Sequence, residues 1–175
     1  MDTVLIALLV MMVILFGVLT LTSGWLASQR LAAAAWDERQ ARALERSATA
    51  LRIVDASAQG GEITLTVENE GSSNLADYDQ WDLIVHCYTA MGQYRIRRLR
   101  HAPAAPMGEW WDVQGIYVDA SESRPEVYDP GILNPGEALV IRATLETPLD
   151  GEAIHLAVLS TENGVVSSRQ FGALP

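Results

Sequence analysis

The sequence contains a long run of apolar positions near its N-terminal end. No charged side chain occurs between Thr3 and Gln29, and the residues from Val4 to Leu21 are almost pure hydrocarbon. A helix needs about 20 such residues to cross a bilayer. The run therefore predicts a helix that can span a membrane.

The helical pattern continues beyond this apolar run. Residues 25–51 contain strong helix formers and no proline. Charged residues such as Glu38 and Arg42 are four positions apart, a spacing at which side chains on one helix interact. Apolar residues recur between the charges at helical spacing, at Ala33, Trp36, Ala43 or Leu44, Ala48 and Leu51. The pattern predicts one helix from about residue 3 to about residue 52, roughly 75 Å long.

A helix of this length exceeds what a membrane requires, because the hydrocarbon layer is only about 30 Å thick. A transmembrane anchor followed by a solvated stalk is one interpretation. The second half is, however, rich in small residues, with an alanine block at residues 32–35. Small residues let helices approach one another closely. The composition therefore favours a helix that packs among copies of itself.

From about residue 52 the apolar period changes from 3.6 to 2, which indicates strands. Turn residues separate the alternating runs, and Asn163-Gly164 is a strong signal for a two-residue hairpin loop. We expect long surface loops at His101–Gly108 and Ala120–Gly131. The clearest runs are Glu62–Glu68, Trp81–Tyr88, Ala138–Leu145 and Ala153–Leu159, and further candidates are Leu51–Ala56, Tyr94–Arg98, Trp110–Val118 and Val165–Phe171.

Seven or eight short strands in about 120 residues are typical of an antiparallel sandwich of immunoglobulin-like type. The predicted fold class is α+β, with a long N-terminal hydrophobic α-helix followed by an antiparallel immunoglobulin-like β-sandwich. We assign residues 1–52 to the helix and residues 53–175 to the β-sandwich, which we call the head. The head is long enough to form one good core.

The charge distribution separates these two parts. The chain has 175 residues with a net charge of -10, yet its mean hydropathy is slightly positive at +0.12. Residues 1–60 contain five acids and five arginines and are therefore neutral overall. The whole net charge of -10 resides in residues 61–175. Such a head repels phosphate, which argues against nucleic acid as a partner. All twelve basic residues are arginine, which excludes lysine-based chemistry.

No catalytic arrangement is visible in the sequence, so we expect neither an enzyme nor a cofactor. His86 and His155 lie in alternating strands, where ordinary half-buried positions are expected rather than ligand roles. Cys87 is the single cysteine, which excludes an intrachain disulfide, and a buried thiol is expected there. Trp110-Trp111 suit the core, with a loop clamp or a subunit contact as alternatives.

Two clusters of charge leave alternatives open. Four arginines and a histidine lie in or just after the predicted strand Tyr94–Arg98. A nucleic-acid patch is one interpretation, but on an acidic domain we expect them to pair with acids of the same domain or of a neighbouring copy. Calcium is a weak alternative to the absence of a metal, because two acidic groups offer oxygen ligands without the spacing of a known calcium loop. The basic cluster is Arg95, Arg97, Arg98, Arg100 and His101, and the acidic groups are Asp77, Asp79 and Asp82, and Asp119, Glu122 and Asp129.

The apolar run does not read as a removable secretory signal. Such a signal has a positive n-region and a small-residue cleavage site, whereas no cation precedes Arg30 and no good cleavage site closes the run. Arg30, Arg39 and Arg42 alone would draw the C-terminal side into the cytoplasm. We hypothesise that a short cationic leader preceding residue 1 is removed, which would reconcile these signals.

Three stretches carry a resemblance to a known family. The apolar run ends in Ser-Gly-Trp-Leu-Ala-Ser-Gln-Arg at residues 23–30, and the alanine-rich continuation enters a strand at Leu51–Val54. The head contains Val-Glu-Asn-Glu-Gly at residues 67–71 and Asp-Pro-Gly-Ile-Leu-Asn-Pro-Gly-Glu at residues 129–137. In these stretches and in its layout the chain resembles an archaellin, the filament subunit of the archaeal swimming organelle, within the type IV filament superfamily. Position 5 is Leu5, where type IV pilins usually carry a glutamate, and this favours an archaellin.

The resemblance implies a structural subunit of an archaellum-like motility filament. The helices would form the polymerising core and the heads the outer surface, so the main partners would be further copies of the chain. It also implies a class III signal peptide, its dedicated peptidase, an ATP-driven assembly platform, and a stay in the cytoplasmic membrane before assembly. The final location would be an extracellular filament at the cell surface.

Two sets of residues are expected to make the contacts between copies. The predicted helix–helix polymerisation core is Val4, Leu5, Leu8, Leu9, Met12, Leu15, Phe16, Leu19, Trp25, Leu26, Ala33, Trp36 and Leu44. The candidates for head–head contacts are Arg95, Arg97, Arg98, Arg100, Trp110 and Trp111.

Two other roles share this layout. One is a minor pilin, a pseudo-archaellin or an envelope-anchoring stator protein of the same machinery. The other is a membrane-anchored domain that binds a ligand or an envelope component. Cellular copy number would separate a filament subunit from both.

Overall fold

The computed structural model describes residues 2–103, 107–119 and 124–174. The chain forms two compact units, Met1–Leu44 and Glu45–Pro175. The first is helical and the second is the head, which carries the strands.

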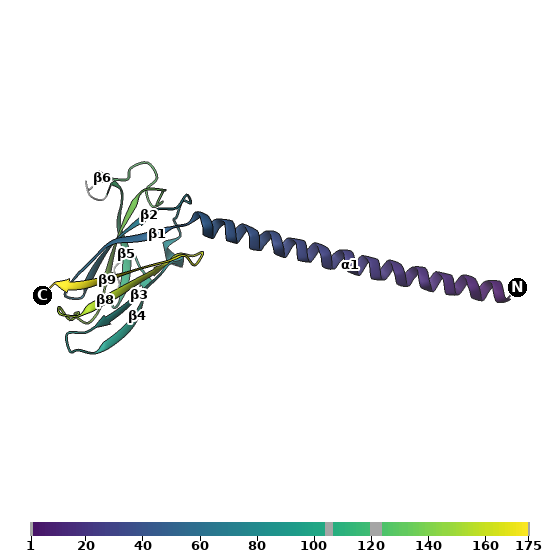
Figure 1. Ribbon diagram of the computed structural model, residues 1–175, viewed down its shortest axis with the longest axis horizontal. Coiled ribbons are helices and arrows are strands. Elements are labelled where there is room, and N and C mark those ends of the chain that lie inside the picture. Colours follow the sequence, from purple (N-terminus) through teal and green to yellow (C-terminus); the bar gives the residue numbers. More distant parts are fainter. Residues whose placement is uncertain (1, 104–106, 120–123, 175) are drawn as a thin grey trace. The chain divides into compact units, whose positions relative to one another are not determined.

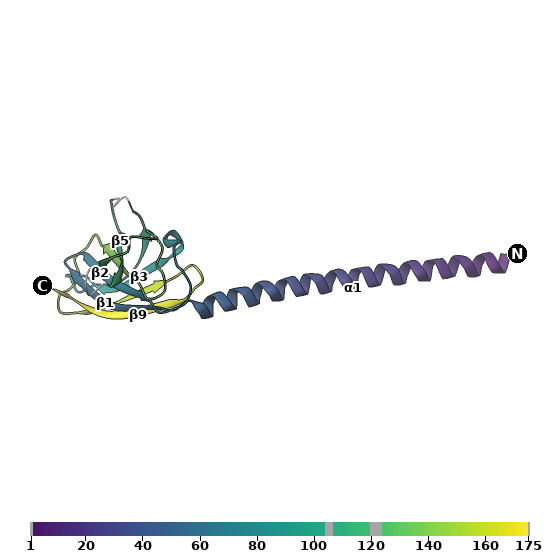
Figure 2. The same cartoon turned by 90° about the horizontal axis from the view of Figure 1, so that it is seen from above.

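Helix α1 spans Asp2–Ala48 and is drawn without a break in both views (Figure 1, Figure 2). It contains no proline, and no charged side chain occurs in it between Thr3 and Gln29. The predicted long helix is confirmed, although it ends at Ala48 rather than near residue 52, because strand β1 already begins at Leu51. Its stretch Leu5–Thr22 is long and apolar enough to cross a membrane.

All eight predicted strands are present in the head. A ninth short strand, β6, falls in the stretch that we expected to be a loop, and a 3₁₀ helix, η1, spans Tyr78–Gln80. The strands are β1 Leu51–Gln59, β2 Glu62–Asn69, β3 Asp82–Tyr88, β4 Tyr94–His101, β5 Trp110–Asp119, β6 Arg124–Pro125, β7 Ala138–Thr144, β8 Ile154–Ser160 and β9 Val166–Leu174.

The strands form two antiparallel groups that join at both sides. One group has the order β4-β3-β8-β9 and the other β1-β2-β7-β5-β6. Short parallel pairings connect β9 to β1 and β4 to β5, so eight strands close into a barrel-like arrangement. The expectation of a purely antiparallel sheet is therefore wrong at these two seams. Apolar alternation reports which face of a strand is buried, but not which strand lies beside it.

The core of the head comes from the inward positions of both groups. Ile63, Leu65 and Val67 of β2 face inward in alternation with polar residues. Leu83 of β3 and Leu159 of β8 also face inward, but their strands carry apolar residues on the outward side as well. Among the described residues, every member of this core cluster lies between Leu51 and Ala173. The core of the head therefore includes no residue of α1.

The last turn of α1 belongs to the head unit and is capped by it. The final carbonyl groups of a helix lack partners within the helix. Here the carbonyl oxygen of Ala48 accepts hydrogen bonds from the backbone N–H groups of Ser72 at 2.7 Å and Ser73 at 3.2 Å. The carbonyl oxygen of Ala50 accepts two more, from the N–H groups of Glu70 and Gly71. The β2–η1 loop thus supplies the donors that the helix end requires.

A buried asparagine shapes this capping loop. The Asn69 side chain donates to the carbonyl oxygens of Ser73 at 2.8 Å and Leu133 at 3.1 Å, and its Oδ1 accepts from the N–H of Gly71 at 3.0 Å. A Cβ at Gly71 would lie within 2.5 Å of the Ala50 nitrogen and even closer to the Ala48 carbonyl oxygen. Only glycine fits between the loop and the helix end.

The β8–β9 hairpin also forms hydrogen bonds with the end of α1. Arg46 Nε donates to the carbonyl oxygen of Asn163 at 2.6 Å, and Asn163 Nδ2 donates to Thr49 Oγ1 at 2.7 Å. The Thr161 N–H donates to the Val165 carbonyl oxygen at 3.0 Å, so the loop has three residues instead of the predicted two. The extra residue lets Asn163 present both its carbonyl and its side chain to the helix.

Removing core volume should destabilise the head. Leu65 is fully buried, so Leu65→Ala should lower the free energy of unfolding by about 2–5 kcal/mol. Met91 is 85% exposed, and Met91→Ala should change it by no more than about 0.5 kcal/mol. Urea unfolding of the full chain in detergent, followed by tryptophan fluorescence, measures both, and equal effects would contradict the described core.

The tight fit of Gly71 makes a second prediction. Gly71→Ala should force the capping loop away from the helix end and destabilise the head by about 1–3 kcal/mol, the usual range for overpacking. Gly172→Ala is the matched control, since no neighbouring atom lies within 4 Å of a Cβ there. Unfolding midpoints report the difference, and hydrogen exchange at Ser72 and Ser73 should accelerate only in the Gly71 variant.

Tyr78 gives the head a sensitivity to alkaline pH. Burial, with smaller contributions from Glu137 and Glu162, raises the pKa of the Tyr78 hydroxyl above its ordinary 10.0. The unfolded chain then loses this proton at lower pH than the folded head, so the Tyr78 contribution to stability declines as pH rises above about 10. Tyr78→Phe should flatten this decline in urea unfolding between pH 8 and 11. An unchanged slope would refute the assignment.

Candidate assembly surfaces

The apolar part of α1 has no partner within its own unit. Between Leu5 and Leu21, all of them described, fourteen large hydrophobic side chains are exposed. They occupy consecutive positions, so they face every side of the helix, which is typical of a helix buried in lipid or among other helices. The predicted core positions in this stretch are all exposed, namely Leu5, Leu8, Leu9, Met12, Leu15, Phe16 and Leu19.

The remaining predicted helix positions follow the same trend. Trp25, Ala33, Trp36 and Leu44 are exposed. The side chains of Val4 and Leu26 lie outside those that the structure describes. Which of these residues contact another copy remains a prediction.

The few polar groups in the apolar stretch are satisfied within the helix. The hydroxyl of Thr20 donates to the carbonyl oxygen of Phe16 at 2.8 Å, and that of Thr22 donates to Val18 at 2.7 Å. Polar side chains in an apolar environment need such partners. These hydroxyl groups therefore do not oppose burial of the helix in lipid or in a helix bundle.

The second half of α1 offers a different surface. Glu38 and Arg42 form an ion pair at 2.5 Å, and the Arg39 guanidinium lies 6.0 Å from the ring centroid of Trp36. Exposed pairs of this spacing contribute only about 0.2–0.5 kcal/mol. The charges of Glu38 and Arg42 therefore stay paired whether this half is solvated or packed against other helices.

The arginines of β4 find partners within the head. Arg98 donates to Asp82 at 2.6 Å, Arg97 lies 3.4 Å from Glu109, and Arg95 donates to the Gln93 side chain at 2.8 Å. The expected pairing with acids of the same domain is thus found for Arg97 and Arg98. Arg95, Arg98 and Arg100 are exposed and available to a neighbouring copy, and Arg97 is half-buried.

Trp110 and Trp111 belong to the interior of the head. Trp111 has no exposed surface and lies 4.7 Å from the ring of His101, measured between centroids. Trp110 is almost as buried, with the Arg142 guanidinium 5.5 Å from its ring. Trp111 is a member of the core cluster, which agrees with the core interpretation, whereas Trp110 is buried outside that cluster. A contact of either tryptophan with another copy stays a prediction. Adjacent aromatic residues in an alternating run do not reveal that both faces of this strand are covered.

The three histidines hold structural positions. His101 lies between two carboxylates, with Nδ1 2.6 Å from Asp79 and Nε2 3.4 Å from Asp112. His155 is fully buried instead of half-buried: its Nδ1 accepts the N–H of Tyr88 at 3.3 Å, and its Nε2 lies 3.0 Å from the Asp150 carbonyl oxygen. The alternation of β8 places His155 on the inward side with Ala157 and Leu159, but the Tyr88 backbone that satisfies its Nδ1 belongs to β3, 67 residues away in sequence.

Four of the six acids considered for calcium are engaged elsewhere or lie outside the description. Asp79 contacts His101 and Asp82 contacts Arg98. Within the described part of the chain, no group of three or more His, Cys, Asp or Glu residues is arranged to hold a metal. Of the second acidic set, the side chain of Asp119 and all of Glu122 fall outside the described residues. Calcium therefore stays a weak alternative without a described site.

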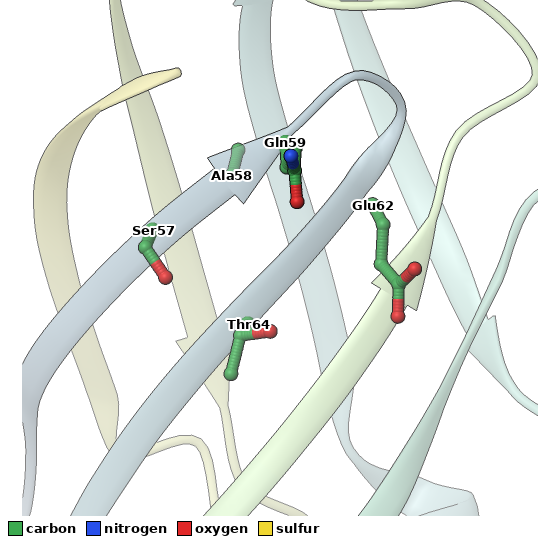
Figure 3. Close-up of a pocket in the computed structure, with 5 residues that line it drawn as sticks. All are labelled: Ser57, Ala58, Gln59, Glu62 and Thr64. Atoms are coloured by element: carbon green, nitrogen blue, oxygen red, sulfur yellow. The ribbon is translucent and has the colours of Figure 1, made fainter. Parts of the chain in front are cut away.

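Two further features bear on chemistry. Burial raises the pKa of the Cys87 thiol, which opposes formation of the reactive thiolate. An open depression of about 310 Å³ lies beside the β1–β2 hairpin (Figure 3). It is lined by Ser57, Ala58, Gln59, Glu62 and Thr64. These residues supply hydroxyl and carboxylate groups but no histidine or lysine to activate a nucleophile.

Comparison with solved structures relates this architecture to archaellum proteins. The archaeal flagellum of Methanospirillum hungatei strain JF1 aligns with a TM-score of 0.53 and 14% identity over 99% of this chain and 91% of that chain. The periplasmic stator protein FlaG of the Sulfolobus acidocaldarius archaellum aligns with a TM-score of 0.51 and 19% identity over 70% of this chain and 99% of that one. Flagellin FlaB1 from Methanocaldococcus jannaschii aligns with a TM-score of 0.51 and 10% identity, over 73% of this chain and 91% of that chain.

No protein-family model and no curated protein matches the chain. The identities to the solved structures are low, so the likeness concerns three-dimensional structure and not a shared sequence. The alignment with the Methanospirillum hungatei flagellum spans both the helix and the head, whereas those with FlaG and FlaB1 cover 70% and 73% of this chain. The head therefore has a fold found in both filament and stator proteins of the archaellum.

Proposed function

We propose that this protein is a structural subunit of an archaellum-like motility filament that polymerises through its N-terminal helix. The observation that carries the proposal is the exposure of the entire apolar stretch Leu5–Thr22 beside a head whose core is complete without it. The likeness to the Methanospirillum hungatei flagellum supports it, because that alignment extends over nearly the whole chain and not only over the head.

The size of the apolar surface determines how such a helix can move. Exposing the fourteen large side chains between Leu5 and Leu21 to water would cost on the order of 20–40 kcal/mol, at about 1.5–3 kcal/mol each. That exceeds the whole stability of an ordinary domain, which is about 5–15 kcal/mol. The helix therefore passes from lipid directly into a bundle of equivalent helices.

The head is suited to the outside of such a polymer. The whole net charge of -10 resides in residues 61–175, and this charge keeps neighbouring filaments dispersed in water. We assign α1, Asp2–Ala48, to the polymerising helix and the strands from β1 onward to an immunoglobulin-like β-sandwich closed at its edges. The predicted helix positions, including Val4 and Leu26, would contact other copies.

This role implies a sequence of partners and locations. The chain first lies in the cytoplasmic membrane, where a class III signal peptidase processes it, and an ATP-driven platform then transfers it into the filament. Its final place is an extracellular filament at the cell surface. The role needs neither catalysis, cofactor nor nucleic acid.

A stator protein of the same machinery is the second candidate. The observation that favours it is the alignment with FlaG, which covers 99% of that chain and has the highest identity of the three structures compared, 19%. In that case the helix would be a permanent membrane anchor and the head would bind the cell envelope. A minor subunit of the filament, or a membrane-anchored binding domain, shares these requirements.

Abundance in released filaments separates these roles. Cells that produce the protein should release filaments on shearing, and mass spectrometry should find this chain as their dominant component. The reason is that a core of packed helices needs one copy for every subunit position. If the chain stays in the membrane fraction at a few copies per motor while filaments contain another subunit, the stator role replaces the filament role.

A charge in the apolar helix should block incorporation selectively. Met12→Arg would bury an unpaired cation in the helix bundle, at a cost of several kcal/mol. Thr66→Arg, at an outward position of the head, is the control. We expect Met12→Arg to be depleted at least about tenfold from filaments relative to its level in the membrane fraction, with Thr66→Arg unaffected. Equal incorporation of both variants would contradict a helical core.

A further inference from the structure

Helix α1 carries two exposed tryptophans on one face. Trp25 and Trp36 are eleven positions apart, which is close to three full turns of a helix, so their side chains project from the same side about 16 Å apart along the axis. Trp25 is 62% exposed and Trp36 is 68% exposed. The two residues match in type, face and exposure, so their position along the helix is what distinguishes them.

Trp25 lies just beyond the membrane-length stretch. That stretch ends at Thr22, and three further residues advance the helix axis by about 4.5 Å. The polar layer of headgroups on each side of the hydrocarbon is about 5–7 Å thick, and we call it the headgroup layer. When Leu5–Thr22 fills the hydrocarbon, Trp25 therefore falls in the headgroup layer, whereas Trp36 lies about 21 Å beyond Thr22 and outside that layer.

The chemistry of an indole suits the headgroup layer. Tryptophan combines a large apolar ring with one N–H donor and no acceptor. Lipid carbonyl and phosphate oxygens accept such a hydrogen bond beside the first acyl carbons, so both parts of the side chain are satisfied there. In the hydrocarbon the N–H group would lack a partner, and in water the ring would stay exposed. For these reasons tryptophan is enriched at both surfaces of a bilayer.

The residues around the two tryptophans differ accordingly. Residues 23–29, which surround Trp25, carry no charge. The first cation, Arg30, lies about 12 Å beyond the apolar stretch and so reaches water. Trp36, by contrast, is followed directly by charged residues, and the Arg39 guanidinium lies 6.0 Å from its ring centroid. The surroundings of Trp25 therefore suit an interface, and those of Trp36 suit water.

The apolar stretch itself does not define a depth in the membrane. Fourteen large hydrophobic side chains occupy it and face every side, so a shift of the helix along its axis exchanges one apolar residue for another. The hydroxyl groups of Thr20 and Thr22 donate to backbone carbonyl groups of the helix and need no partner from lipid. The depth is therefore set by flanking residues, and among the described side chains Trp25 is the nearest large one that carries a polar group.

We propose that Trp25 binds the headgroup layer of the membrane and fixes the depth of α1 before assembly. This role rests on the membrane stage of the proposed function. The partner of Trp25 at that stage is lipid, and a neighbouring helix replaces the lipid only when the chain enters the filament. Trp25 is thus a positioning residue, because it holds the helix at one depth without taking part in any reaction.

The depth of both rings can be measured on the full chain, labelled with 5-fluorotryptophan, in phospholipid nanodiscs. Trp25→Phe and Trp36→Phe assign the two fluorine signals, and both changes spare the core of the head because the rings are exposed. Three paramagnetic probes are used in turn: a nitroxide on the lipid headgroup, a nitroxide near the end of the acyl chain, and a water-soluble gadolinium chelate. We expect the headgroup nitroxide to relax the Trp25 signal at least about fivefold more than that of Trp36, because the rings lie about 16 Å apart along the axis and the effect falls with the sixth power of distance. Trp36 should respond most to the chelate.

The variant Trp25→Leu tests the anchoring itself. It lengthens the apolar stretch, and a helix longer than the hydrocarbon settles deeper or tilts. Either change brings Trp36 nearer to the headgroup layer, so its relaxation by the headgroup nitroxide should rise about twofold. Trp36→Leu is the matched control and should leave the Trp25 signal unchanged. If the Trp36 signal does not respond to Trp25→Leu, Trp25 does not fix the depth.

Three other results would overturn the role of Trp25. Equal effects of the headgroup nitroxide on both rings would show that the helix lies along the surface or that neither ring is near it. A strongest effect of the chain-end nitroxide or the chelate on Trp25 would place the ring in hydrocarbon or in water. Protection of Trp25 from all three probes would identify a second copy as its partner in the membrane. Loss of the chain from the nanodisc fraction would instead contradict the membrane stage as well, and the filament role is tested separately by shearing.

Discussion

The structure depends on an apolar helix surface that its own unit leaves uncovered. A soluble domain buries such side chains in its core, but the core of this head is built entirely from residues 51–173 within the described chain. The stretch Leu5–Thr22 must therefore find lipid or other protein, because water is excluded by an energy of tens of kcal/mol. Solubility, location and oligomeric state all follow from this one constraint.

The head solves a related problem at the other end of the helix. A helix carried in a polymer or anchored in a membrane must transmit its position to the domain that it bears. The final carbonyls of α1 are capped by the loop that Asn69 shapes, and the β8–β9 hairpin holds Thr49 and Arg46. Hydrogen bonds from two loops far apart in sequence join the last helical turn to the first strand. The last turn of α1 is therefore part of the head unit.

The two outward surfaces of the head differ in a way that the overall acidity conceals. One is covered by glutamates, threonines and paired arginines, as a solvated sheet should be. The other places tyrosines and isoleucines between an arginine border and the polar residues of β9. A net charge of -10 describes the sum of these surfaces but not their arrangement.

Periodicity alone was enough for the helix and all eight principal strands, because the 3.6 and 2.0 spacings are local properties of the chain. It also placed the alternating core residues, such as Ile63, Leu65 and Val67, on one face. The burial of Trp110 and His155, by contrast, depends on residues that are distant in sequence. The same holds for the glycine at position 71, whose lack of a side chain matters only because the helix end packs against it.

The sequence by itself therefore determined that the protein has a membrane-length helix, a β-sheet head, and a separation of hydrocarbon from negative charge. Those properties reside in consecutive residues. Only the tertiary structure decided the parallel seams that close the sheet, the capping of the helix end, and the apolar face of β3, β4 and β8. These features exist only when strands from different parts of the chain lie side by side, because strand order is set by long-range pairing that no local pattern encodes.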